Sequence, residues 1–163
     1  MNNKMLSLLM VQGAMIAAIY VVVTFALAPI SFQEIQLRVS EALTILPMFT
    51  PAAVPGLFIG CLIANAISGA PLPDIVFGSL ATLLGAIGTR MLRNRKPVVA
   101  IIPPILANMF IVPYILRYAY EVPLPIPLMM LTVGAGEAVS CGVLGLLLHK
   151  ALFVHRKDIF KAE

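Results

Sequence analysis

Long apolar runs with very few charges constrain this fold more than any other feature of the sequence. Hydrophobic residues make up 61% of the 163 residues, charged residues make up 11%, and the mean hydropathy is +1.02. A soluble domain of this size would need more polar residues to cover its surface. The sequence therefore predicts an all-α membrane protein, and its length suits one integral membrane domain over residues 1–163.

Apolar stretches of membrane length predict six transmembrane helices. A helix that crosses a bilayer needs about 20 apolar residues. We expect such helices at residues 5–28, 75–92, 98–118 and 127–153. The stretch 42–69 carries Pro47, Pro51 and Pro55, and prolines interrupt helices. We expect this stretch to break near residues 50–55 and to form two short segments.

Basic residues indicate that the proline-rich stretch crosses the membrane twice. They cluster at Lys4, at residues 90–96 and at residues 150–161, and positive residues gather on the cytoplasmic side of membranes. All three clusters share one side only if residues 42–69 cross twice. Of the eleven Lys and Arg residues, only Arg38 and Arg117 then lie outside. Both chain termini are expected in the cytoplasm.

Glu137 is isolated within the last apolar run. It is the single charged residue between Glu121 and Lys150. A carboxylate inside a membrane helix is costly, so it normally faces a cavity or a polar partner. This predicts that the chain binds or moves a ligand within the bilayer. The expected topology also places more acids than arginines in the outer half, which favours a cationic ligand from outside. The acids are Glu34, Glu41, Asp74, Glu121 and Glu137.

Polar residues cluster at the entrance of the proline-rich stretch, where Gln36, Arg38 and Glu41 lie close in sequence. One interpretation is a substrate-facing cluster that contacts a polar ligand. The other is an interfacial ion pair of Arg38 with Glu41 or Glu34, since helical residues three or four apart are neighbours, next to a helix capped by Ser40.

Three further polar residues have two interpretations each. Asn65 and Asn108 can read a nucleobase edge, because an amide both donates and accepts hydrogen bonds. They can equally bond one helix to another. Asp74 is a ligand-binding candidate or the N-cap of the helix that follows it.

Small residues recur at four-residue spacing on several expected helices, which lets helices approach closely. On residues 5–28, Ala14 and Ala18 form an Ala-xxx-Ala pattern that overlaps one with Gly13 and Ala17. We expect the small residues of the helices at 75–92 and 127–153 to pack within the chain. Ala14 and Ala18 are candidates for docking a separate membrane subunit.

Several catalytic and metal-binding motifs are absent from the sequence. No Gly-x-x-x-x-Gly-Lys-Ser/Thr loop occurs, so no ATP cofactor is expected in this chain. No His-Glu-x-x-His pattern occurs, so the sequence gives no reason to expect a metal ion. Cys61 and Cys141 are interpreted as buried packing residues. No Gly-x-Ser-x-Gly context occurs. The chain is therefore not expected to be an enzyme; a membrane enzyme acting on lipid would need a cluster of Asp or His residues at one interface.

Three linked runs, at residues 28–47, 55–65 and 74–83, resemble the QueT family, with a weaker match at Gly136-Glu137-Ala138. QueT proteins are substrate-binding S components of energy-coupling factor (ECF) transporters in prokaryotic cell membranes. The resemblance implies an S-component-like bundle of six helices that works with one membrane coupling subunit and two ATPases, which use ATP. It implies a queuosine precursor as substrate, and in particular 7-aminomethyl-7-deazaguanine. It also implies that Ala14 and Ala18 meet the coupling subunit.

The chemistry of that ligand suits the candidate residues. Carboxylates such as Glu41 and Glu137 can accept from a guanine-like ring and pair with its ammonium, while Gln or Asn reads the remaining edge. An aromatic ring can stack on the ligand. The stacking candidates are Phe32, Phe49, Phe77 and Tyr114. The alternatives are an S component for another vitamin-like ligand and a small proton-coupled carrier that uses Glu137.

Overall fold

The computed structural model describes residues 3–27 and 38–160, and helices account for all regular structure among them. This confirms the all-α prediction. The first pass is α1 (Asn3–Ala26), followed by the 3-10 helix η1 (Val39–Met48) and α3 (Ala53–Ile67). The π-helical turn η2 (Asp74–Gly78) continues into α4 (Ser79–Met91), and α5 (Pro97–Ala100) leads into α6 (Ile102–Tyr118). The last pass joins α7 (Ile126–Glu137), η3 (Ala138–Leu144) and α8 (Gly145–Ile159).

The six passes agree with the predicted ones, including the break in the proline-rich stretch. η1 ends at Met48 and α3 begins at Ala53, so the prolines separate two short helices. Within the described residues, three helical segments are long and apolar enough to cross a bilayer, at 3–26, 97–118 and 126–156. Two shorter apolar helices, η1 and α3, form the proline-rich pair.

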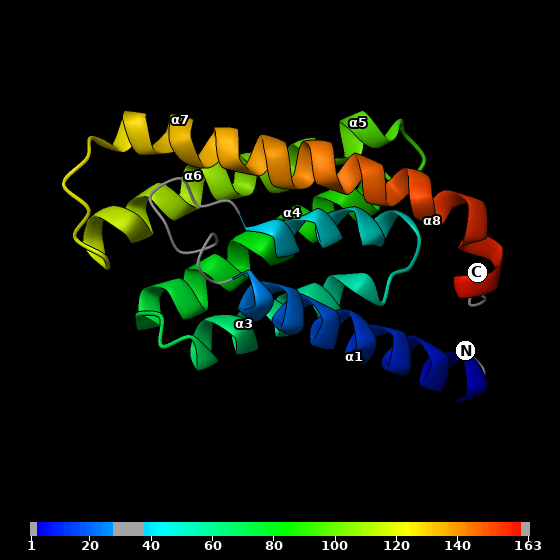
Figure 1. Ribbon diagram of the computed structural model, residues 1–163. Coiled ribbons are helices and arrows are strands. Elements are labelled where there is room, and N and C mark those ends of the chain that lie inside the picture. The colour runs from blue at the N-terminus through cyan, green and yellow to red at the C-terminus, as the bar shows by residue number, and fades with distance from the viewer. Residues whose placement is uncertain (1–2, 28–37, 161–163) are drawn as a thin grey trace.

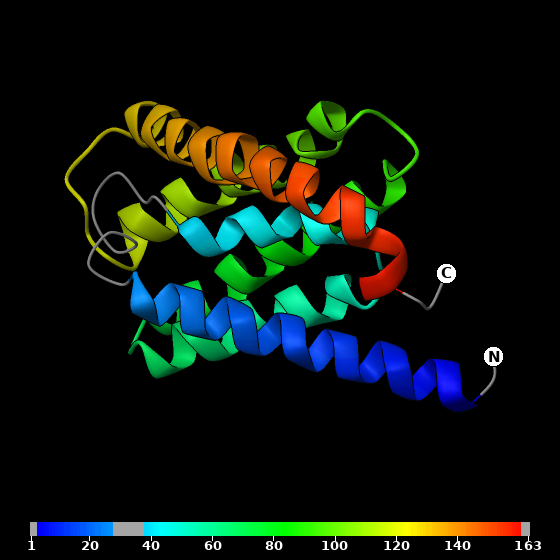
Figure 2. The same ribbon diagram turned by 45° about the vertical axis from the view of Figure 1, so that its right-hand side comes forward.

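The chain termini lie at the same end of an elongated helical bundle (Figures 1 and 2). We call this the terminal end; the connections at 49–52 and 92–96 also lie there. The connections at 68–73 and 119–125 lie at the opposite end, which we call the far end. The chain therefore runs up and down the bundle an even number of times, as the charge pattern predicts.

Glycines allow α1 to pack directly against α3. A Cβ atom on Gly56 would lie 2.6 Å from the carbonyl oxygen of Gly13, and one on Gly60 would lie 3.0 Å from that of Ala17. The Gly13 and Ala17 face of α1 is therefore buried against α3. Ala14 and Ala18 remain exposed on the same helix, so the two overlapping small-residue patterns have different environments.

Small residues in the later helices pack within the chain, as predicted. A Cβ atom on Gly85 of α4 would lie 2.6 Å from the Cα of Pro104 in α6. One on Gly134 of α7 would lie 3.3 Å from the sulfur of Met109, also in α6. α6 is thus held between α4 and α7.

η1 lies at the centre of the bundle, against α1, α4, η3 and α8. Its residues from Ser40 to Pro47 are buried except for Leu43. In a 3-10 helix, side chains three residues apart lie one above the other, which aligns Glu41 with Thr44. The short, tight helix therefore carries a carboxylate into the interior.

Candidate functional site

Glu41 is the centre of the polar network inside the bundle. Its side chain is 1% exposed. Its Oε1 accepts a 2.5 Å hydrogen bond from the Tyr20 hydroxyl of α1 and a 3.1 Å bond from the Thr82 hydroxyl of α4. Its Oε2 has no hydrogen-bond partner among the described residues. One oxygen of the carboxyl group is therefore fixed, and the other remains available as an acceptor.

Glu137 lies beside Glu41, as the last residue of α7. Its Oε2 accepts from the Cys141 thiol at 3.1 Å. A carboxyl oxygen of Glu41, one of Glu137 and the Cys141 sulfur all lie within 4.8 Å of one another, and all three residues are buried. The fold thus brings together two carboxyl groups that are 96 positions apart in the sequence, at Glu41 and Glu137.

Two more buried polar atoms have no hydrogen-bond partner within the described residues. Asn108 of α6 lies close to both carboxyl groups. Its Nδ2 and the Oγ of Ser140 have no hydrogen-bond partner in the described parts of the chain. A buried polar group without a partner costs about 1–3 kcal/mol, so such groups are rare and call for an explanation. Acceptors and donors left free around one point suit a polar ligand.

π-helical turns adjoin both parts of the site. The sequence predicts uninterrupted helices at 75–92 and 127–153. The structure instead has π-helical turns at η2, which begins with Asp74, and at η3, which follows Glu137. Such turns are rare and occur frequently at functional sites. A π-helical turn rotates the side chains that follow it about the helix axis. No sequence pattern indicates where such a turn occurs.

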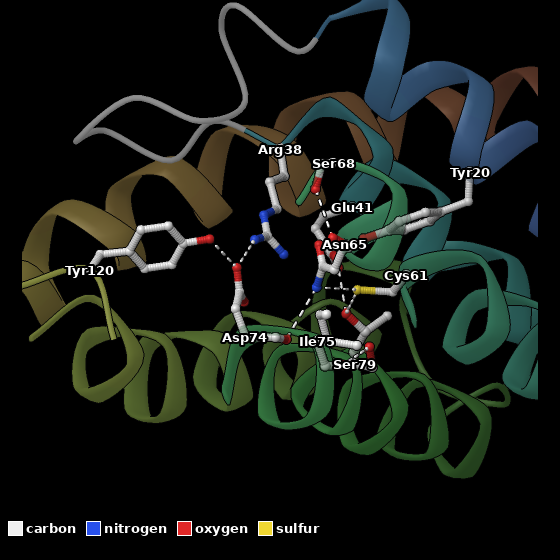
Figure 3. A network of polar contacts seen from close by, with 11 residues as sticks. Tyr20, Arg38, Glu41, Cys61, Asn65, Ser68, Asp74, Ile75, Ser79 and Tyr120 are labelled. Atoms are coloured by element: carbon white, nitrogen blue, oxygen red, sulfur yellow. Dashed lines mark hydrogen bonds and ion pairs between the residues drawn. The ribbon is translucent and has the colours of Figure 1, made fainter. Parts of the chain in front are cut away.

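A second polar cluster lies nearer the far end of the bundle. Arg38 donates to Oδ2 of Asp74 at 3.3 Å, and the Tyr120 hydroxyl donates to the same oxygen at 2.7 Å. Figure 3 shows both side chains converging on Asp74. Oδ1 of Asp74 has no partner among the residues described. Partial burial and the bond to Asp74 raise the pKa of Tyr120 above its ordinary value, so the phenol stays a donor.

The structure corrects three interpretations of the sequence. Arg38 pairs with Asp74 and not with Glu41. Ser40 does not cap η1, because its Oγ accepts from the Thr24 hydroxyl at 2.9 Å, and η1 has no side-chain cap. Asp74 does not act as an N-cap either, since its carboxylate faces Arg38 and Tyr120. Glu34, the other proposed partner of Arg38, lies outside the described residues.

Asn65 makes the helix-to-helix hydrogen bond that was one of its two interpretations. Its Nδ2 donates to the carbonyl oxygen of Asp74 at 3.2 Å and to the Cys61 sulfur at 3.7 Å. Asn65 therefore fixes the start of η2, and through it the position of Asp74. Cys61 is fully buried, as a packing residue is expected to be.

The aromatic candidates do not join the polar network. Tyr114 is 49% exposed and Phe77 is 54% exposed, so both lie on the outer surface of the bundle. Phe49 stacks against His149 and Phe160 at the terminal end. Phe32, the fourth aromatic candidate, and Gln36 of the polar cluster lie outside the described residues.

Sequence reasoning missed several residues of the network, all with hydroxyl or thiol groups. A hydroxyl inside an apolar helix is the one signal that could have pointed to them, because it must find a partner there. These residues are Tyr20, Thr82, Tyr120, Ser140 and Cys141.

Comparison with known proteins identifies the family. A stretch of 73 residues is 38% identical to "Queuosine precursor transporter QueT" of Lactococcus lactis subsp. cremoris (strain MG1363). That match covers 44% of this chain and 43% of the relative, so it spans less than half of the relative's length. No solved structure matches the chain. The family model for the QueT transporter matches residues 10–153, which is most of the chain. The chain therefore belongs to the QueT transporter family.

Proposed function

We propose that this chain is the substrate-capture subunit of an ECF importer and binds a queuosine precursor, 7-aminomethyl-7-deazaguanine, from outside the cell. The observation that carries the proposal is the buried pair Glu41 and Glu137, with unpaired polar atoms around it. The name of the Lactococcus lactis relative, a queuosine precursor transporter, supports the substrate class. The ligand is a planar ring with hydrogen-bond donors and one ammonium group, and the site offers matching acceptors.

Glu41 recognises the ring of the ligand by accepting hydrogen bonds from its edge. Hydroxyl donors from Tyr20 and Thr82 fix one of its oxygens, which orients the other. A fixed acceptor suits the directional N–H groups of a guanine-like edge. The free Nδ2 of Asn108 donates to the ring carbonyl on the same side. An adenine-like ring, with an amine in that position, would leave two donors facing each other.

Glu137 pairs with the ammonium. Its described donor is a thiol, at Cys141, and thiols are weak donors. The carboxylate therefore keeps most of its charge for a cation. A buried carboxylate needs such a partner, because an isolated charge in an apolar interior is very costly.

The far end of the bundle is the proposed outer side. The Arg38–Asp74–Tyr120 cluster lies near that end, and its Tyr120 belongs to the α6–α7 connection. The terminal end carries most of the basic residues of the chain, which favours the cytoplasm for that end. The basic residues of the terminal end are Lys4, Arg90, Arg93, Arg95, Lys96, Lys150 and Arg156.

The partners we propose are a membrane coupling subunit and two ATPases, which supply the energy. Ala14 and Ala18 are the contact surface on this chain. Their exposure supports this role, since the rest of the small-residue pattern on α1 is already packed against α3. Residues 1–163 are proposed to act as one membrane domain.

Equilibrium binding to the purified chain tests the proposal. We expect 7-aminomethyl-7-deazaguanine to bind at one site by isothermal titration calorimetry without ATP. Adenine-type deazapurines are the matched control and are expected to bind weakly. The absence of both heat and competition, with folded protein, would contradict the proposal.

The buried acids also suit a proton-coupled carrier, the second candidate. Two carboxyl groups so close together can share a proton. Uptake into cells separates the two functions. Uptake through an ECF module needs ATP hydrolysis and the partner ATPases, whereas uptake by a carrier persists without them and stops when a proton uncoupler is added.

A further inference from the structure

The three groups at the centre of the site have the composition of a metal site. Glu41, Glu137 and Cys141 offer two carboxyl oxygens and one sulfur within 4.8 Å of one another. In a tetrahedral zinc site, bond lengths of about 2.0–2.3 Å place the ligand atoms roughly 3.3–3.8 Å apart. The thiol of Cys141 is already 3.1 Å from Glu137 Oε2 and 3.4 Å from the main-chain oxygen of Glu41. The largest separation that the three ligand atoms can have is therefore within about 1.5 Å of what one tetrahedral ion requires.

Unpaired atoms around the acids point independently to a bound species. Glu41 is 1% exposed, and its Oε2 has no partner in residues 3–27 and 38–160. Ser140, next to Cys141 in the chain, is fully buried, and its Oγ also has no partner within that part of the structure. Glu41 Oε2 is an acceptor within the three-residue set, and a water molecule can supply the fourth ligand of a tetrahedral ion.

Charge also favours a cation at this point. Glu41 and Glu137 lie side by side, while Arg38 is directed to Asp74 at 3.3 Å. Bringing two carboxylates together in an apolar interior is unfavourable without a positive partner. The proposed substrate supplies one through its ammonium. A divalent ion supplies two charges in a smaller volume.

We propose that Glu41, Glu137 and Cys141 form a binding site for a thiophilic divalent cation, Zn²⁺, and that the ion and the substrate exclude each other. Binding converts the Cys141 thiol to a thiolate and releases its proton to the solvent. Glu137 Oε2 then loses its hydrogen bond from the thiol and binds the metal ion instead. Thiolate selects zinc over calcium or magnesium, which prefer sites made of oxygen alone. The competition between ion and substrate rests on the proposed function, whereas metal binding itself does not.

Metal titration of tag-free protein in detergent tests the inference. Cd²⁺ serves as the spectroscopic probe, because a cadmium–thiolate bond gives an ultraviolet charge-transfer band, and Zn²⁺ is titrated by calorimetry. We expect one ion per chain and a proton released on binding, seen as a heat that changes with buffer. Cys141→Ser is expected to abolish the band and to lower Zn²⁺ affinity by at least about tenfold.

Cys61→Ser is the matched control, since Cys61 is also a buried thiol but lies outside the three-residue set. We expect it to leave the band and the affinity unchanged. Glu137→Gln provides a second variant that keeps the thiol, and we expect its Zn²⁺ affinity to fall. Thermal unfolding of each variant shows that it is folded.

The outcomes separate this inference from the proposed function. A folded wild-type protein without a saturable band, or a band that Cys61→Ser removes and Cys141→Ser does not, would overturn the metal site. Metal binding without binding of 7-aminomethyl-7-deazaguanine would support the site and contradict the proposed substrate. If both bind, each is expected to displace the other; simultaneous binding would overturn their mutual exclusion.

Discussion

Tyr20 donates a 2.5 Å hydrogen bond to Glu41, and this contact joins α1 to the centre of the candidate site. Tyr20 is 1% exposed, whereas Ala14 and Ala18 lie on the exposed side of the same helix. One helix therefore carries a buried face that contacts the site and an exposed face that is available to a partner. The two faces can be tested separately.

Bulky substitution of the exposed face of α1 is expected to block transport and spare binding. Ala14→Trp or Ala18→Trp places a large ring where a partner helix must approach closely. We expect ligand binding to be unchanged, co-purification with the ATPases to be lost, and uptake in cells to stop. The measurements are calorimetry, pull-down and cellular uptake.

Ile19→Trp is the matched control for that surface. Ile19 is exposed on α1, about 140° around the helix from Ala14. It is expected to retain both binding and uptake. Loss of ligand binding in the Ala14 and Ala18 variants, with misfolding, would mean that this face packs within the chain.

The pair of Arg38 with Asp74 is expected to hold the far end together. Asp74→Asn leaves Arg38 buried without its charged partner, which typically costs about 3–5 kcal/mol of folding free energy. Tyr120→Phe removes one hydrogen bond to the same carboxylate and is expected to cost about 1 kcal/mol. Thermal unfolding in detergent measures both.

Glu121→Gln is the control for this cluster, because Glu121 is exposed one residue after Tyr120. We expect no change in its unfolding temperature. An equal effect of Asp74→Asn and Glu121→Gln would show that the Arg38 pair contributes nothing to stability.

Close packing of α1 on α3 predicts a contrast between two glycines. A Cβ atom on Gly56 would meet backbone at 2.6 Å, whereas one on Gly142 has its nearest neighbour, a side-chain atom of Ile101, at 3.9 Å. Gly56→Ala is expected to destabilise the protein by about 1–3 kcal/mol, as overpacking does. Gly142→Ala is expected to be neutral or slightly stabilising. Equal unfolding temperatures would show that α1 can move away from α3 at little cost.

The membrane passes were predictable from the sequence because hydrophobic length and proline positions act locally. Residues 75–92 and 98–118 correspond closely to η2–α4 and α5–α6. The basic clusters, a property of the chain alone, also predicted an even number of passes. The site was harder, since it depends on contacts between distant segments.

Glu137 was recognisable as a costly acid and Glu41 as part of a polar cluster, but their proximity follows from the position of η1 inside the bundle. The interpretation that pairs Arg38 with Glu41 was wrong because it rested on local spacing, whereas the fold brings Asp74 to Arg38. The described aromatic candidates lie outside the polar network for a similar reason. Tyr114 faces outward on α6. The residue type alone does not tell which side of the helix a tyrosine occupies.

Calorimetry with two ligands and two variants tests the central claim most directly. The ligands are 7-aminomethyl-7-deazaguanine and its nitrile analogue, 7-cyano-7-deazaguanine, which has the same ring and no charge. If Glu137 pairs with the ammonium, Glu137→Gln should weaken binding of the amine by about 3–5 kcal/mol, the cost of breaking a buried ion pair, and affect the nitrile much less. If Glu41 reads the ring, Glu41→Gln should weaken both ligands. Equal losses for amine and nitrile in Glu137→Gln, with folded protein, would contradict the assignment of Glu137 as the cation partner.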